Sequence, residues 1–322
     1  MEGMHREVAR IMKRILAVGL SPAIQKTITF KGLSIDSVNR STGYRLDASG
    51  KAVNAARVMH QLEPGSADAL CPLGRENAQA FLDLARDDGL SVESIEVPGR
   101  VRHCYTLVEP GTGRATELVV GEPDAVGAWD SIADAMVERV SFLLDRVDAL
   151  LFAGSRPSSW PPDLPARIVA LAKRRGRTVM ADFHGPDLSL TISRAAPDII
   201  KINEEEFCGT FGYEFPLAEG ELARLIGKRS AETGSLIVVT RGARDAFAAS
   251  GGEVFRGRVT RVSALNAIGC GDAFNAGFLH AWLSDQDVSS ALERGAWCAT
   301  RNARNLRPGS IRDPDAEGEG LL

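Results

Sequence analysis

Asn266-Ala267-Ile268-Gly269-Cys270-Gly271-Asp272-Ala273-Phe274-Asn275-Ala276-Gly277-Phe278 is a glycine turn that runs into an acid and then into a long apolar stretch typical of a helix. Glycines let the backbone turn tightly, and the first turn of a helix leaves N–H groups unpaired, so the segment predicts a cradle for an anion. Gly269, Cys270 and Gly271 would form this cradle, with Asp272 beside the bound anion. A gripped phosphate next to a carboxylate is the arrangement that phosphoryl transfer needs. The plainer alternative is a turn followed by a helix with Asp272 as its N-cap.

Four more segments of the chain carry short motifs that follow one another in a fixed order. They are Leu20-Ser21-Pro22-Ala23-Ile24-Gln25, Asp47-Ala48-Ser49-Gly50-Lys51-Ala52-Val53-Asn54-Ala55-Ala56-Arg57, Lys201-Ile202-Asn203-Glu204-Glu205-Glu206 and Val238-Val239-Thr240-Arg241-Gly242. In this order, and together with the glycine turn, they resemble the signatures of the PfkB (ribokinase-like) carbohydrate kinases. The resemblance is strongest to the branch that contains the 1-phosphofructokinases and the tagatose-6-phosphate kinases.

The resemblance implies an α/β fold, namely a ribokinase-like three-layer α/β/α domain with a largely parallel central sheet and a small β-sheet lid. Short apolar runs that alternate with amphipathic stretches agree with this, because they are typical of βαβ units. We expect one domain over residues 15–310, lid strands within 27–46 and 101–119, an N-terminal extension at 1–14 and a polar tail at 311–322. Buried strands are predicted at 15–19, 67–71, 149–153, 178–182, 199–202 and 236–239, and helices at 52–62, 79–88, 164–175, 219–232, 273–283 and 291–303.

Composition limits the classes of function. The 322 residues are 44% hydrophobic, which is enough for a large core. A net charge of -4 argues against partners held by bulk positive charge, so we expect no nucleic acid and no membrane partner. The five cysteines show no paired spacing, which predicts free thiols in a reducing cytoplasm. The five histidines show no zinc-binding spacing.

The resemblance assigns roles at the phosphoryl-transfer end and implies ATP and Mg²⁺ as cofactors. Asp272 is the expected catalytic base, and we expect the helix N-terminus to favour its ionised form and so to make it a weak base. Asn203 and Glu206 lie three residues apart on a predicted first helical turn and would hold Mg²⁺ through its waters. The alternative is that the acids there simply begin a helix. The expected nucleotide contacts are Lys201, Asn203, Thr240 and Gly242.

The resemblance puts a small sugar or sugar phosphate against the lid. The expected substrate contacts are Gln25, Arg40, Ser49, Gly50, Lys51, Asn54 and Arg102. In the phosphosugar branch the positions of Arg40 and Arg102 hold the substrate's own phosphate, for which a guanidinium fork is suited. The alternative for each arginine is an exposed lid charge. By resemblance alone, the lid would also join two subunits into a homodimer, and a monovalent cation beside the anion cradle stays open.

Several departures from the family pattern lie at the substrate end. Gln25 stands where the family has an aspartate, and an amide donates at one atom and accepts at the other, whereas a carboxylate only accepts. Further departures are Ser49 and Ala52 in place of glycines, Ile202 in place of proline, Ala267 in place of threonine, and Asp245, a negative charge near the nucleotide, in place of glycine. The phosphoryl-transfer end is therefore close to the family pattern and the substrate end is altered.

Two hypotheses about function follow. The first is ATP-dependent phosphoryl transfer to a hydroxyl of a sugar or sugar phosphate. The alternative is a catalytically weak sugar-phosphate or nucleotide-binding protein on a kinase fold. An NAD-dependent oxidoreductase is disfavoured because Gly269-x-Gly271 lacks the third glycine of the dinucleotide fingerprint, and a Walker-type loop because Ala52 follows Gly50-Lys51 where Ser or Thr is needed.

Overall fold

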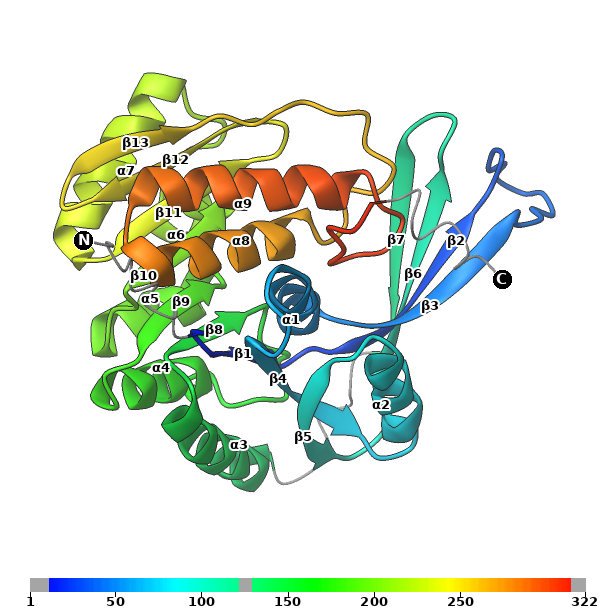
Figure 1. The fold of residues 1–322 in the computed structure, drawn as a ribbon, viewed down its shortest axis with the longest axis horizontal. Coiled ribbons are helices and arrows are strands. Elements are labelled where there is room, and N and C mark those ends of the chain that lie inside the picture. The colour runs from blue at the N-terminus through cyan, green and yellow to red at the C-terminus, as the bar shows by residue number, and fades with distance from the viewer. Residues whose placement is uncertain (1–11, 122–128, 314–322) are drawn as a thin grey trace, which may run out of the picture.

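The computed structural model describes residues 12–121 and 129–313, and a nine-stranded sheet forms the centre of the domain (Figure 1). Its strands are β1 (Ile15–Val18), β4 (Ala67–Gly74), β5 (Ser91–Val97), β8 (Ala149–Ala153), β9 (Thr178–Asp182), β10 (Ile199–Asn203), β11 (Leu236–Arg241), β12 (Arg244–Ser250) and β13 (Glu253–Gly257). They lie in the order β13-β12-β11-β10-β9-β8-β1-β4-β5. In this spatial order, neighbouring strands from β11 through β1 to β5 are parallel, and β12 and β13 add an antiparallel hairpin at one edge.

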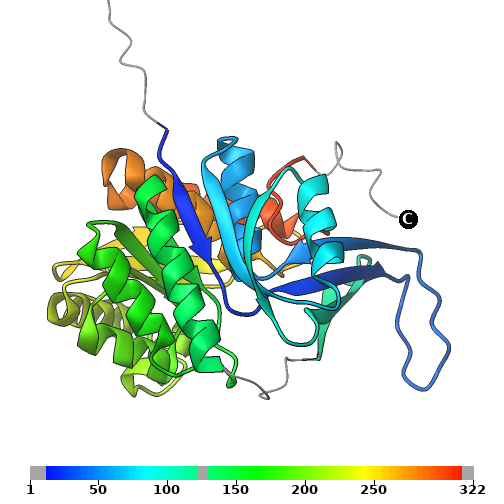
Figure 2. The same ribbon diagram turned by 90° about the horizontal axis from the view of Figure 1, so that it is seen from below.

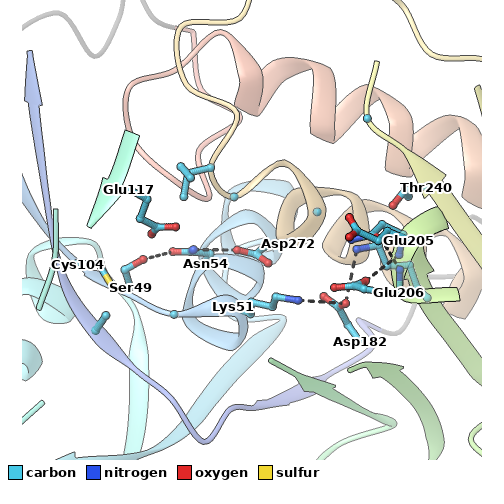
Figure 3. Close-up of a pocket in the computed structure, with 18 of the residues that line it drawn as sticks. Ser49, Lys51, Asn54, Cys104, Glu117, Asp182, Glu205, Glu206, Thr240 and Asp272 are labelled. Carbon is cyan, nitrogen blue, oxygen red and sulfur yellow. Dashed lines mark hydrogen bonds and ion pairs between the residues drawn. The ribbon is translucent and has the colours of Figure 1, made fainter. Parts of the chain in front are cut away.

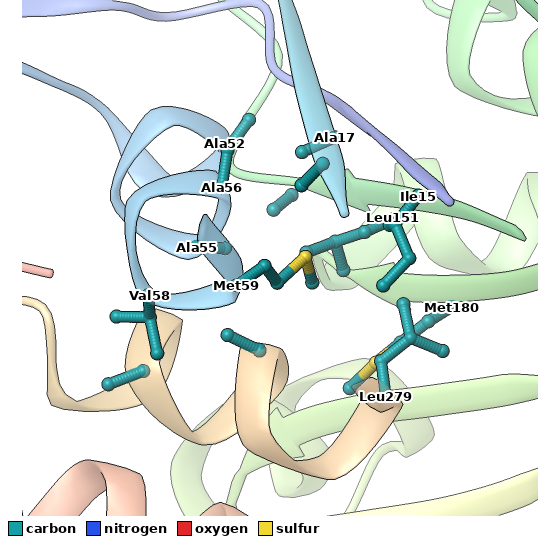
Figure 4. Close-up of a cluster of buried hydrophobic side chains, with 14 of the residues drawn as sticks. Ile15, Ala17, Ala52, Ala55, Ala56, Val58, Met59, Leu151, Met180 and Leu279 are labelled. Carbon is teal, nitrogen blue, oxygen red and sulfur yellow. The ribbon is translucent and has the colours of Figure 1, made fainter. Parts of the chain in front are cut away.

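Helices cover both faces of this sheet. Alternate residues of each central strand are therefore buried in two separate apolar clusters, one on each face. In β1, Ile15 and Ala17 belong to one cluster, and Leu16 and Val18 to the other. The first face carries α1 (Lys51–Leu62), α2 (Ala78–Asp87), α8 (Cys270–Asp285) and α9 (Val288–Ala303). The second face carries α3 (Trp129–Leu143) with the short 3₁₀ turn η1 (Leu144–Arg146), α4 (Leu164–Arg174), α5 (Gly185–Arg194), α6 (Glu204–Phe211) and α7 (Glu219–Thr233). Figure 4 shows side chains of α1 and α8 packed onto Ile15 and its neighbours in the sheet.

A second, four-stranded sheet forms the lid. It consists of β3 (Gly43–Ser49), β2 (Ala23–Thr29), β6 (Arg102–Glu109) and β7 (Arg114–Val120), in that order. The two inner strands are parallel and each outer strand is antiparallel to its neighbour. Because β2 follows β1 directly and α1 follows β3 directly, the lid is anchored beside the end of a central strand. Figures 1 and 2 show it projecting from the body of the domain.

The predicted fold is confirmed, and the boundaries differ in informative places. We predicted that β4 would end before Pro72, but it continues to Gly74. Its ladder with β1 stops at Leu70, so Pro72 lies where β4 has only β5 as a partner, and such a position tolerates proline. The hairpin of β12 and β13 was missed although Gly251-Gly252 between the strands is a hairpin signal.

The predicted domain limits of 15–310 fall near the ends of the described chain. Of the predicted extension at 1–14 and tail at 311–322, residues 1–11 and 314–322 lie outside the described residues. Ile311 is buried in the core, and its N–H donates to Gln61 Oε1 on α1 at 2.7 Å. Packing therefore continues just beyond the predicted end. Among the helices that the structure describes, none has the length and apolar character needed to cross a membrane.

Candidate active site

A polar cavity of about 600 Å³ lies between the lid and the carboxyl ends of β9, β10 and β11 (Figure 3). Asp182, Asn203 and Arg241 are the last residues of these three strands, and all three line the cavity. Ligands of open parallel sheets bind in the crevice outside the carboxyl ends of the strands. The topology therefore brings this cavity to the place where a ligand site is expected.

Most of the residues predicted for the site do line this cavity. They are Gln25, Ser49, Gly50, Lys51, Asn54, Arg102, Lys201, Asn203, Glu206, Thr240, Gly242, Gly269, Gly271 and Asp272. Arg40 does not: it lies in the exposed loop between β2 and β3. The reason is that these two strands pair over seven residues, which carries their connecting loop to the far tip of the lid.

Asp272 is the third residue of α8, and the N-cap is Gly269, so the alternative of Asp272 as an N-cap is wrong. Gly269 has a φ of 82°, and a Cβ at this position would lie 2.7 Å from the backbone nitrogen of Gly309. Only glycine fits such a turn against a neighbouring backbone. The glycine is thus required both by its conformation and by its close packing.

The predicted cradle needs one revision. The N–H of Cys270 donates to the Ala267 carbonyl at 3.3 Å, so it is already engaged, and the Cys270 side chain lies in a neighbouring pocket. Among the described residues no acceptor is found for the N–H groups of Gly269, Gly271 and Asp272. These three N–H groups, rather than that of Cys270, are available to an anion.

The Asp272 carboxylate is buried at the cavity wall, with 6% of the residue exposed. Burial raises its pKa to about 6, against the opposing effects of Lys51 and of a hydrogen bond from Asn54. We expected the helix N-terminus to favour the ionised form, but burial, the largest effect on the pKa of this carboxyl, favours the protonated form. A carboxylate with a pKa near neutrality is a better proton acceptor than an ordinary aspartate.

Asn54 connects Asp272 to the lid. Its Nδ2 donates to Asp272 Oδ2 at 2.9 Å, and its Oδ1 accepts from Ser49 Oγ at 3.0 Å, as Figure 3 shows. Ser49 and Asn54 were both predicted to contact the substrate. The structure adds that Asn54 also touches the proposed base.

Asp182 forms a buried charge cluster that the sequence analysis missed. Its Oδ1 lies 3.5 Å from Lys51 Nζ and 3.7 Å from Lys201 Nζ, and its Oδ2 accepts from Asn275 Nδ2 at 2.6 Å. Burial would raise the pKa of Asp182, but Lys201 and Lys51 hold it below its ordinary value. Asp182 in turn raises the pKa of Lys51. The cluster keeps two cations at the cavity wall, with Lys201 Nζ only 3.1 Å from where a Cβ of Gly271 would lie.

Asn203 and Glu206 form a capping box at the start of α6. Asn203 Oδ1 accepts from the Glu206 N–H at 2.8 Å, and Glu206 Oε2 accepts from the Asn203 N–H at 2.8 Å. The alternative prediction, that the acids here begin a helix, is thus confirmed for Glu206, which completes the cap of α6. Both residues also line the cavity, and Glu206 Oε1 lies 3.8 Å from His184 Nε2, so that oxygen is not used by the cap.

An apolar pocket of about 270 Å³ adjoins the polar cavity. Thr240, Arg241, Gly242, Arg244 and Gly271 line both. Asp245 lines neither, because its carboxylate is held by Arg256 Nε at 2.9 Å and by the Val259 N–H at 3.1 Å. The negative charge that we expected beside the nucleotide is therefore paired on the neighbouring strand.

Comparison with known proteins places this architecture. A family model for pfkB family carbohydrate kinases matches residues 12–310. The chain belongs to the PfkB family. A 1-phosphofructokinase of Rhodobacter capsulatus is 32% identical over 270 residues, which are 83% of each chain. A structure described as a possible 1-phosphofructokinase from Thermotoga maritima superposes with a TM-score of 0.82 at 17% identity, covering 96% of this chain and 98% of that one. Phosphofructokinase-2 from Escherichia coli in complex with potassium gives 0.80 at 18% identity with the same coverage.

As a PfkB kinase, the protein has the activity that the motifs predicted: ATP-dependent phosphoryl transfer to a hydroxyl of a sugar or sugar phosphate. The lid wall of the cavity contains a residue that the sequence analysis missed. Glu117, on the exposed strand β7, lines the cavity, and Figure 3 shows it near Ser49 and Asn54. Its signal would have been the single acid of the lid strand Arg114–Val120, which is weak by itself.

Gln25, the departure that motivated the alternative function, is also on the cavity wall and only 2% exposed. Its Nε2 donates to Thr106 Oγ1 at 2.7 Å on the neighbouring lid strand. This bond uses one of the two N–H groups of the amide, and the carbonyl oxygen can still accept a hydrogen bond from a ligand. Gln25 can thus act as an acceptor towards a hydroxyl, as an aspartate at this position would.

Proposed function

We propose that this kinase phosphorylates a phosphorylated ketohexose, with fructose 1-phosphate as the first candidate, and that Asp272 is its catalytic base. The position of Asp272 at the junction of the two cavities carries the proposal. Gly271, the residue before it, lines both the polar cavity and the apolar pocket. A nucleotide with its base in the apolar pocket and its phosphates at Gly271 would bring its last phosphate beside Asp272. The name of the Rhodobacter relative supports the substrate class.

In the proposed reaction, Asp272 accepts the proton of the attacking hydroxyl. Its pKa of about 6 leaves the carboxylate ionised at pH 7 and still near the working pH of a general base. The N–H groups of Gly269, Gly271 and Asp272 would stabilise the charge on the transferred phosphoryl group. Lys51 and Lys201 add positive charge at the same wall, and Asp182 holds both in place.

The residues present fit a Mg²⁺ ion that is held mainly by phosphates and water. In residues 12–121 and 129–313 no cluster of three or more His, Cys, Asp or Glu side chains could hold a metal alone. We propose that Asn203 and Glu206 contact its water shell, since Mg²⁺ retains several waters in nucleotide sites. When bound, the ion would neutralise charge on the nucleotide phosphates. A monovalent cation is a narrower proposal, supported by the potassium complex of the E. coli phosphofructokinase-2.

At the lid, we propose that Gln25 and Glu117 accept hydrogen bonds from sugar hydroxyls and that Arg102 binds the phosphate already on the sugar. All three line the polar cavity. Ser49, Gly50, Lys51 and Asn54 complete the substrate wall. Arg40, at the exposed tip of the lid, could take part only after a movement of the lid or across a subunit contact.

We further propose that two subunits pair through their lids in the cytoplasm. The outer lid strands expose Leu46, Leu118, Val119 and Val120 by 42–54%. Such exposed strands need cover. All five cysteines are free thiols, as predicted, which supports a reducing compartment. Sedimentation of the purified protein tests the pairing: a monomer at micromolar concentration would overturn it.

A panel of sugars and sugar phosphates tests the function. Melting temperature is measured with ATP-Mg²⁺ and each compound, and each compound that stabilises the protein is then assayed for ADP release. We expect fructose 1-phosphate both to stabilise the protein and to drive ADP release, and Asp272→Asn to abolish release while nucleotide stabilisation persists. Stabilisation without any ADP release across the panel would favour the alternative, a binding protein of weak activity.

A further inference from the structure

Arg57 lies behind the active site and is 1% exposed. It does not line the polar cavity, so it cannot touch substrate or nucleotide there. Its Nη1 donates to Asn54 Oδ1 at 3.1 Å, one helical turn earlier on α1. Asn54 in turn donates to Asp272, the proposed base, so Arg57 is connected to Asp272 through one intervening side chain.

The hydrogen bonds of Asn54 fix the direction of its amide. Oδ1 accepts from two donors, Arg57 Nη1 and Ser49 Oγ. An amide flipped by 180° would turn its NH₂ group towards those donors and its oxygen towards the Asp272 carboxylate, which only accepts when ionised. Arg57 cannot lose its proton, so it always demands an acceptor at this point. Nδ2 must then donate to Asp272 Oδ2, as it does at 2.9 Å.

Arg57 is itself held by several parts of the chain. Its Nε donates to Asp88 Oδ2 at 3.0 Å, its Nη1 also donates to the Pro308 carbonyl at 3.0 Å, and its Nη2 donates to the Ala48 carbonyl. Arg307 contacts both Asp88 and, at 2.9 Å, Asp47 Oδ1. Asp47 is the lid residue opposite Gln25 on β2. The guanidinium thus joins the lid base, α1, the end of α2 and the loop after α9.

We propose that Arg57 is a positioning residue of the kinase: by fixing the amide of Asn54, it keeps an N–H donor on the catalytic carboxylate and holds that carboxylate in its ionised form and reactive orientation. The proposal rests on Asp272 being the base. The other charged groups that face Asp272 are Lys51 of α1, Asp182 of β9 and Lys201 of β10. Arg57 donates directly to Asn54 Oδ1, so a change at Arg57 acts on Asp272 through the Asn54 bond.

Arg57→Lys tests the proposal, because lysine keeps the buried positive charge but not the planar fork that serves four acceptors. The expected result is a kcat lowered roughly tenfold or more, a KM for ATP within about twofold, and an acid limb of the kcat profile moved to higher pH. The last shift follows because a donor to a carboxylate favours its ionised form. Arg45→Lys is the matched control, since Arg45 lies on the lid strand β3 and joins the same network through its bonds to Asp47 at 2.8 and 2.9 Å.

A second variant keeps the test decisive if Arg57→Lys does not fold. Asp88→Asn weakens the anchor at Arg57 Nε and leaves Arg57 itself, and it should move the acid limb in the same direction by a smaller amount. In an Asn54→Leu background, the effect of either change on the acid limb should vanish, because the connection to Asp272 is already cut. A folded Arg57→Lys with an unmoved acid limb and unchanged kcat overturns the proposal, and so does an equal shift in Arg45→Lys. An active Asp272→Asn would instead overturn the proposed function.

Discussion

The two walls of the active site are built in opposite ways. At the phosphoryl-transfer wall, backbone groups and glycines define the site. A Cβ on Gly269 would lie 2.7 Å from the Gly309 nitrogen, and a Cβ on Gly309 would lie 2.7 Å from the Cα of Asn54. At the lid wall, side chains on an open four-stranded sheet define the site, and every residue of β7 is exposed. A site made of backbone tolerates few substitutions, whereas a site made of side chains can change the ligand it recognises by substitution. Two departures from the family pattern, Gln25 and Ser49, are side chains of the lid strands β2 and β3.

The largest effect should come from Asp272→Asn at the rigid wall. A general base contributes about 10²- to 10⁴-fold, so kcat should fall by roughly 10³-fold. The free energy of unfolding of this variant should rise at pH 7. The pKa of Asp272 rises from 3.8 to about 6 on folding, so its contribution to stability is fully present below pH 3.8 and is lost as pH rises towards 6. At pH 7 the buried charge then costs about 3 kcal/mol, which a neutral amide avoids.

Melting temperature at pH 7 and initial rates of ADP release check this prediction together. A variant that is inactive and also less stable than the wild type would mean that Asp272 is needed for packing rather than for chemistry. The same comparison at pH 4, where the wild-type carboxyl is protonated, should bring the two melting temperatures closer together.

Gly269→Ala should have the next largest effect, because it introduces a Cβ into the backbone contact with Gly309. A positive φ alone costs about 1–2 kcal/mol for a residue other than glycine. Gly176→Ala is the matched control, since Gly176 has a φ of 66° and no atom within 4 Å of its Cβ position. We expect Gly269→Ala to lose clearly more stability in urea than the control, and roughly 100-fold in kcat. Equal losses in the two variants would show that close packing adds nothing at Gly269.

The contrast between the walls also explains what the sequence could predict. Gly269 and Asp272 were found because a turn and the helix after it are local, and their conformation depends on adjacent residues. Asp182 and Asn275 were missed because they are 93 residues apart and meet only when β9 lies beside α8. Asp245 was misjudged for the same reason, since its partner Arg256 lies on the next strand. Glu117 and Arg40 depend on where the lid strands point, and no local pattern encodes that.

A smaller effect concerns pH. The rate should fall as pH drops below about 6, roughly tenfold per pH unit, because the Asp272 carboxyl becomes protonated and can no longer accept the hydroxyl proton. Asp182 should not contribute in this range, since Lys201 and Lys51 hold its pKa below 3.8 despite its burial. Initial rates of ADP release at saturating substrate between pH 4.5 and 8 measure this acid limb of the kcat profile. A limb centred near pH 4 would mean that water or ligand restores the solvation that burial removes.

The smallest expected effect is Glu117→Gln on the lid. Glu117 lines the cavity, and its carboxylate has no hydrogen bond or ion pair with another described residue, so the substitution should leave the melting temperature unchanged. If its carboxylate accepts hydrogen bonds from sugar hydroxyls, the loss of charge should raise the KM for the sugar phosphate about fivefold to tenfold, since a hydrogen bond to a charged group is worth about 1.5–3 kcal/mol and the amide retains part of it. The KM for ATP should not change, because the nucleotide is expected at the opposite wall.

Glu253→Gln, on the exposed strand β13, is the matched control and should change neither constant. A rise in both KM values for Glu117→Gln would mean that the lid acts on the whole site by closing over it, and the separation between a rigid catalytic wall and an adaptable recognition wall would not hold.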